Sequence, residues 1–121
     1  MANLYGASMR GANLLEADLS GTDLRFADLS GAKFTVDQIS KSDWYGAKGI
    51  DVQLFPYNYL HNYGVELISR NENKYADILL SVAIQKLPSA AMTHVARGIS
   101  YYNQSKFSKA SDDFKVAASI Y

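Results

Sequence analysis

The first third of the chain repeats every five residues. Large apolar residues recur at this spacing without a gap, and a small residue lies two positions before most of them. The apolar series is Leu4, Met9, Leu14, Leu19, Leu24, Leu29, Phe34, Ile39 and Trp44. The small residues are Ala2, Ala7, Ala12, Ala17, Thr22, Ala27 and Ala32.

A period of five fits neither a helix nor a flat strand. In an α-helix five residues advance by about 500°, so successive leucines point roughly 140° apart. In a strand an odd spacing sends consecutive leucines to opposite faces. Within one repeat, however, the small residue and the leucine are two positions apart, so a short extended segment directs both to the same side. The remaining positions are polar or Gly, which suits a bend. The pattern therefore predicts short extended steps separated by turns, with both residues facing inward.

These residues resemble a known repeat family. The units ANLYG, ASMRG, ANLLE, ADLSG, TDLRF, ADLSG and AKFTV look like a pentapeptide-repeat protein, over residues 2–47. The resemblance implies a right-handed quadrilateral β-helix with about four repeats per coil. Asn3 would then stack on Asp23, and Ser8 on Asp28. An Ala/Leu-rich helix is the alternative, and it is disfavoured by the recurring glycines Gly6, Gly11, Gly21 and Gly31.

The five-residue pattern weakens after residue 34. Asp37 would occupy an inward position, where burial of a carboxylate is costly. Thr35 and Gln38 have the spacing of a capping box, which predicts a helical turn over residues 35–41. Trp44 is large enough to close the end of the core, and an aromatic platform for a ligand is the other interpretation. We expect this domain to cover residues 1–50, followed by a linker at 51–56.

From residue 57 the period becomes 34. Pairs separated by this distance are Gly64 and Gly98, Ala76 and Ala110, Leu80 and Phe114, and Ala83 and Ala117. This spacing resembles the tetratricopeptide repeat, a helix–turn–helix unit. The predicted helices are 57–70, 74–87, 90–103 and 107–120, which form two α-hairpins over residues 57–121. The expected fold class for the whole chain is α+β. His94, Arg97 and Asn73 depart from the pattern of that family.

The same resemblance implies a concave face lined by the first helix of each hairpin. This face is apolar with a few polar ends, which suits an amphipathic segment of a partner. Burial against the rest of the chain or against another chain is the alternative. The residues predicted to bind a partner are Asn58, His61, Ile68, Met92, Val95, Ile99 and Tyr102, with Val65 on the same face.

Titratable residues give no reactive pattern. His61 and His94 occupy equivalent places in the two hairpins, but two histidines without a Cys or carboxylate beside them make a poor metal site. Asp18, Asp23 and Asp28 recur at five-residue spacing, which we interpret as a solvated ladder on the outer surface. We predict no catalytic residue, no metal ligand and no cofactor site.

Composition excludes some partners. The net charge is zero, with 12 basic and 12 acidic residues, so no basic surface suggests nucleic acid. No apolar run has membrane length. The chain has no Cys, which fits a reducing compartment. We expect a cytoplasmic protein that binds a protein or peptide, and neither nucleic acid nor a membrane.

The resulting functional hypothesis is a scaffold or adaptor for protein–protein interaction, without catalysis. One alternative is a DNA-mimicking inhibitor of a topoisomerase such as gyrase, since some pentapeptide-repeat proteins are thought to act so. Another is a targeting module taken from a larger enzyme. Because both ends of the repeat array lack caps, we also expect either a longer native chain or a homo-oligomer formed through these ends.

Overall fold

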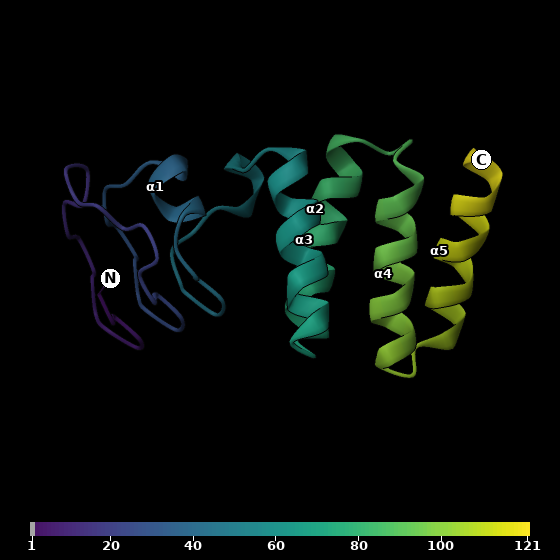
Figure 1. The fold of residues 1–121 in the computed structure, drawn as a ribbon, viewed down its shortest axis with the longest axis horizontal. Helices are drawn as coiled ribbons and strands as arrows, with labels where there is room; N and C mark the ends of the chain where they lie inside the picture. Colours follow the sequence, from purple (N-terminus) through teal and green to yellow (C-terminus); the bar gives the residue numbers. More distant parts are fainter. Residues whose placement is uncertain (1) are drawn as a thin grey trace. The chain divides into compact units, whose positions relative to one another are not determined.

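The structure, a computed structural model, describes residues 2–121 and divides the chain into two compact units. The first unit is Met1–Leu54 and the second, the helical unit, is Phe55–Tyr121. Figure 1 shows stacked loops in the first unit and four long helices in the second. The α-helices are α1 (Val36–Ser40), α2 (Tyr57–Ser69), α3 (Asn73–Lys86), α4 (Ala91–Asn103) and α5 (Phe107–Ile120), with a 3₁₀ helix at Val52–Leu54.

Successive turns of the first unit stack 20 residues apart. Isolated parallel bridges connect the stacked positions, which are Asn3 and Asp23, Ser8 and Asp28, Asn13 and Lys33, Asp23 and Asp43, and Asp28 and Lys48. At each bridge backbone hydrogen bonds pass between the turns; for example, the Leu4 amide donates to the Asp23 carbonyl over 2.8 Å. Four five-residue repeats therefore make one turn. The stacking of Asn3 on Asp23 and of Ser8 on Asp28 is as the sequence predicted.

The predicted β-helix is wrong, and with it the α+β class. Among residues 2–121 there is no β-strand and no sheet, and all regular secondary structure is helical. The physical reason is the turn that follows every bridge. A backbone hydrogen bond closes each turn, such as the one from the Ala7 amide to the Leu4 carbonyl at 3.0 Å. Each side of a turn therefore contributes one bridging residue, and consecutive residues never pair as they do in a strand.

The apolar series points into the first unit. Leu24, Leu29, Ile39 and Trp44 have no exposed surface, and neither does the small residue Ala27. The large and the small residue of a repeat thus share the interior, as the two-residue separation predicted. Leucine side chains that are fully buried contribute about 1.5–3 kcal/mol each, so this interior is what holds the turns together.

Helix α1 replaces one side of the second turn. Thr35 caps it, since the Gln38 amide donates to Thr35 Oγ1 and Gln38 Oε1 accepts from the Thr35 amide, which confirms the predicted capping box. The other end of the Gln38 side chain bonds to the turn before. Its Nε2 lies 2.6 Å from the Leu14 carbonyl oxygen and 2.9 Å from that of Ala17. One side-chain amide thus satisfies carbonyls that would otherwise meet the backbone of the next turn.

The helical unit contains two hairpins whose helices begin and end within one residue of the predicted bounds. Each hairpin has a glycine in its first helix facing a large residue in its second. A methyl group on Gly64 would lie 2.7 Å from Leu80 Cγ, and one on Gly98 would lie 2.5 Å from Phe114 Cε1. Contacts that recur after 34 residues explain the period seen in the sequence, because only glycine permits so close an approach of the two helices.

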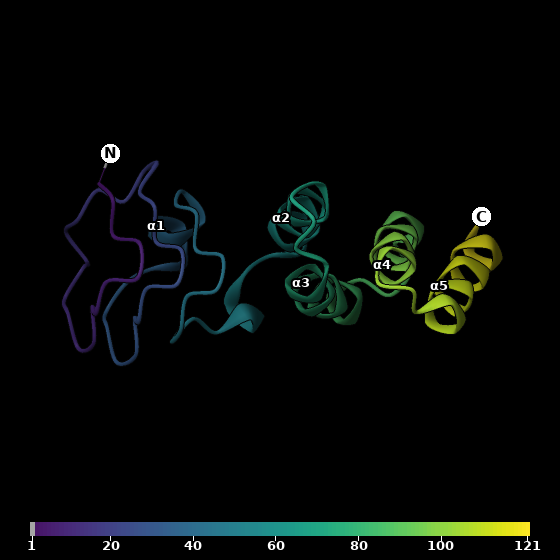
Figure 2. The same cartoon turned by 90° about the horizontal axis from the view of Figure 1, so that it is seen from below.

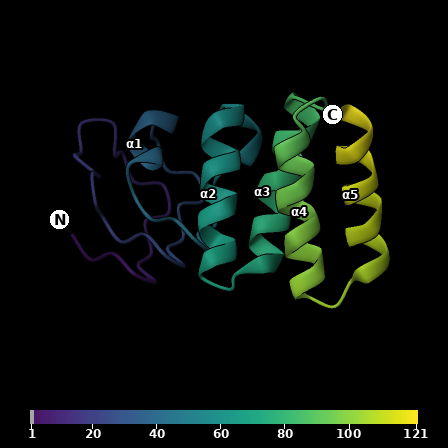
Figure 3. The ribbon, with the colours of Figure 1, turned by 45° about the vertical axis from the view of Figure 1, so that its right-hand side comes forward.

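The four helices form two layers. Figure 2, in which they are seen nearly end-on, shows α2 and α4 in one layer and α3 and α5 in the other. Figure 3 shows that consecutive helices run in alternate directions. Polar contacts tie the second layer to α4: Arg97 donates to both carboxylate oxygens of the buried Asp113, each over 2.8 Å, and to Ser81 Oγ over 3.1 Å. This arrangement leaves α2 and α4 side by side on one face of the unit.

Candidate functional site

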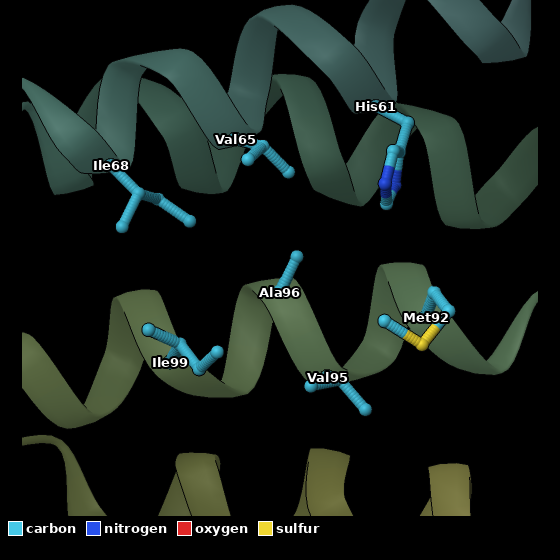
Figure 4. A pocket seen from close by; sticks show the side chains of 7 residues that line it. All are labelled: His61, Val65, Ile68, Met92, Val95, Ala96 and Ile99. Atoms are coloured by element: carbon cyan, nitrogen blue, oxygen red, sulfur yellow. The ribbon is translucent and has the colours of Figure 1, made fainter.

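A groove lies between α2 and α4. It encloses about 290 Å³, and the close-up in Figure 4 shows the side chains of the two helices turned toward it. Its lining is apolar except for one histidine. The lining residues are His61, Val65 and Ile68 from α2 and Met92, Val95, Ala96 and Ile99 from α4.

Helical periodicity produces the two walls. The α2 residues are at positions i, i+4 and i+7, and those of α4 at i, i+3, i+4 and i+7, so each set forms one stripe along its helix. Seven residues at 1.5 Å each give a groove about 10 Å long. This length corresponds to two turns of a partner helix.

The apolar walls are accessible. Val65 is 43% exposed, Met92 58% and Ile99 43%. On the same helices, Leu60 and Leu67 have no exposed surface because they face the interior. Facing stripes of exposed apolar residues are typical of a surface that binds another molecule.

One end of the groove is polar. Thr93, which is fully buried at the start of α4, has its Oγ1 2.5 Å from the Tyr57 hydroxyl and 2.9 Å from His61 Nδ1. The rings of Tyr57 and His61 stack with centroids 5.9 Å apart. Burial lowers the pKa of His61, so this imidazole is neutral at pH 7. The groove therefore contains a polar group without a charge.

Five of the seven residues predicted to bind a partner line this groove: His61, Ile68, Met92, Val95 and Ile99. The other two do not. Asn58 is exposed one turn before His61, and Tyr102 is 61% exposed one turn after Ile99, with its ring against that of Phe107. The predicted stripe continued by one turn at each of these ends, beyond the part where the two helices enclose a groove.

Sequence reasoning missed Thr93 and Ala96. Ala96 is small and forms the floor of an apolar stripe that its neighbours Met92 and Ile99 already indicated by helical spacing. Thr93 gave no such signal, because its two partners are 32 and 36 residues away in the sequence.

The comparisons with known proteins bear on the first unit. A family model described as pentapeptide repeats matches residues 2–35 in eight copies. Residues 2–35 are pentapeptide repeats. No curated protein and no solved structure matched the chain.

The second residue of a pentapeptide repeat has a structural role here. Asp18, Asp23 and Asp28 each accept a hydrogen bond from the amide two residues later, at 3.0–3.1 Å, which fixes the turn. Hydrogen bonds from Arg25 lower the pKa of Asp23. Those from Ser30, with a further one from Arg10, lower the pKa of Asp28 to about 2. These carboxylates are therefore ionised turn residues, and they point outward as a ladder rather than toward a shared substrate.

The second histidine is not part of the groove. His94 is buried, with Nε2 2.9 Å from the Pro88 carbonyl oxygen and Nδ1 3.7 Å from Asp113 Oδ1. The structure thus gives the two equivalent histidines different environments. Within residues 2–121, no three His, Asp or Glu side chains are placed to hold a metal ion. Nor does that part of the chain contain a helix long and apolar enough to cross a membrane.

Proposed function

We propose that this chain is a non-enzymatic protein-interaction module whose helical unit binds an amphipathic helix of a partner protein. The observation that carries the proposal is the groove between α2 and α4, with its two exposed apolar walls. The pentapeptide repeats support a non-catalytic role in general terms, because repeat arrays offer extended surfaces rather than deep polar pockets.

The proposal includes a tetratricopeptide-like character for the helical unit. The 34-residue period, the two helical hairpins and the repeated glycine contacts with Leu80 and Phe114 support it. In that family the first helices of the units line the binding face, and here α2 and α4 line the groove.

The dimensions favour a helical ligand with two apolar anchors. An apolar cavity of about 150 Å³ accepts a benzene-sized ring, so a groove of about 290 Å³ has room for two large side chains. Two anchors one helical turn apart fit its length of about 10 Å. Amphipathic helices present side chains at this spacing when they bind in grooves.

A selection experiment with the full chain tests this function. The protein is immobilised, and a phage library of helical peptides with randomised i, i+3, i+4 and i+7 positions is selected against it. We expect enriched peptides with apolar residues at two of these positions. Their binding should be lost in Val65→Asp, which places a charge in the groove, and kept in Ile78→Asp.

Ile78 is the matched control because it is an exposed aliphatic residue on α3, outside the groove, with 53% of its surface accessible. Peptides that bind Val65→Asp as well as the wild type would contradict the proposal. A library that yields no binder would do so as well.

A further inference from the structure

The polar end of the groove holds a hydrogen-bond donor whose partner lies outside this chain. His61 is the one lining residue with a polar side chain, and in Figure 4 its ring extends from α2 toward α4, opposite Met92. Its Nδ1 bonds to Thr93. Among residues 2–121, Nε2 has no hydrogen-bond partner and is not buried away from solvent.

The hydrogen bonds around Thr93 determine which imidazole nitrogen carries the proton. The Thr93 hydroxyl has one proton and two neighbours, Tyr57 and His61. A phenol is the stronger acid of the two hydroxyls, so we assign Tyr57 as donor to Thr93 and Thr93 as donor to His61 Nδ1. The proton of the neutral imidazole is then on Nε2, because the nitrogen that accepts a hydrogen bond cannot also carry it. The groove therefore offers one N–H donor beside its apolar walls.

The lining also restricts the charge of the ligand. None of the seven lining residues carries Asp, Glu, Lys or Arg. A charged group in this groove would lose its hydration without finding a counter-ion, which is costly. A neutral oxygen acceptor, in contrast, would satisfy the Nε2 donor that ligand binding removes from water.

We infer that His61 makes the groove selective for an amphipathic helix carrying a neutral acceptor, such as Thr, Ser, Asn or Gln, beside its apolar anchors. This inference rests on the proposed function. It commits to a helix of another protein as the occupant, since an uncharged, two-turn groove matches the uncharged face of such a helix.

The test uses a matched pair of synthetic peptides. A peptide from the phage selection is made with Thr or with Val at the position nearest His61, because these side chains have the same shape and only Thr can accept a hydrogen bond. One net hydrogen bond contributes about 0.5–1.5 kcal/mol, so the wild-type chain should bind the Thr peptide about 2- to 10-fold more tightly. Fluorescence anisotropy with each labelled peptide measures both affinities.

Variants of His61 separate the donor from the shape of the ring. His61→Phe keeps an aromatic ring without a donor and should prefer the Val peptide. His61→Gln places an amide N–H near the position of Nε2 and should restore the preference for Thr. Far-UV circular dichroism of both variants verifies that the helices are intact.

Each outcome is decisive. Equal Thr/Val ratios in the wild type and in His61→Phe would overturn the role of His61 while leaving the proposed function in place. If no peptide binds, the proposed function and this inference both fail. Sedimentation velocity provides a further arm: a dimer that Val65→Asp dissociates would identify a second copy as the occupant and overturn the inference.

Discussion

The two equivalent glycines should respond differently to the same substitution, although both lie in the middle of a helix. Replacing a glycine by alanine within a helix increases stability by about 0.8–1 kcal/mol through backbone propensity. Against this gain stands the overlap between the new methyl group and the facing side chain. Inserting a methyl group into a packed interior costs about 1–3 kcal/mol, and whether that full cost applies depends on how freely the neighbour can move.

At Gly64 the neighbour is held in place. The new methyl would lie 2.7 Å from both Cγ and Cδ2 of Leu80, which has no exposed surface. At Gly98 the nearest atoms are Cε1, Cδ1 and Cζ of the Phe114 ring, at 2.5, 2.8 and 3.0 Å, and this residue is 38% exposed. Phe114 can therefore rotate toward solvent. We expect Gly64→Ala to lower the free energy of unfolding by about 1 kcal/mol, and Gly98→Ala to change it by less than about 0.5 kcal/mol.

Urea denaturation followed by circular dichroism at 222 nm measures both values, since α2–α5 dominate this signal. The overlap at Gly64 is isolated by repeating the substitution in a Leu80→Ala background. With the facing side chain shortened, Gly64→Ala should become stabilising by about 1 kcal/mol. Equal effects of the two glycine substitutions, or no coupling between positions 64 and 80, would refute the reasoning.

Three further predictions concern the pentapeptide repeats. Gln38→Met should lower the stability of the first unit by about 1–3 kcal/mol, because the carbonyls of Leu14 and Ala17 lose their donor; urea denaturation followed by Trp44 fluorescence measures this, and an unchanged midpoint would contradict it. The stabilising contribution of ionised Asp28 should be present above its unfolded pKa of about 3.9 and disappear as the pH falls through its folded value of about 2. Asp28→Asn, which keeps the turn-forming side-chain oxygen, should therefore flatten the decline in Trp44 fluorescence midpoint over this range, and an identical decline in the variant would exclude the effect. Finally, the full chain should leave gyrase supercoiling unchanged in a gel assay, because Asp23 and Asp28 are paired with Arg25 and Arg10 rather than forming a negative face; inhibition at stoichiometric concentration would favour the DNA-mimic alternative.

The sequence predicted the helices and the stacking distance well because both depend on local periodicity. A period of 34 located α2–α5, and the Thr35–Gln38 pair located α1. The β-helix was wrong because a period of five says that the chain turns, but not how many consecutive residues pair between turns. In the structure one residue pairs at each bridge, and the hydrogen bonds that close the turns prevent longer strands from forming.

The candidate site was partly predictable for the same reason. Helical spacing indicated both walls of the groove, since residues such as Val65 and Ile99 repeat on one face of their helices. It could not indicate where the groove ends, and so Asn58 and Tyr102 were included. Nor could spacing reveal that Thr93 joins Tyr57 to His61, because these contacts depend on the packing of α2 against α4.

Methyl NMR of the full chain tests the central claim most directly. Of the three methionines, Met92 lines the groove, whereas Met9 belongs to the pentapeptide repeats. In a chain labelled with ¹³C at the methionine methyl groups, titration with a selected helical peptide should shift the Met92 signal and leave that of Met9 unchanged. A peptide that binds without moving the Met92 signal would show that the groove between α2 and α4 is not the binding site.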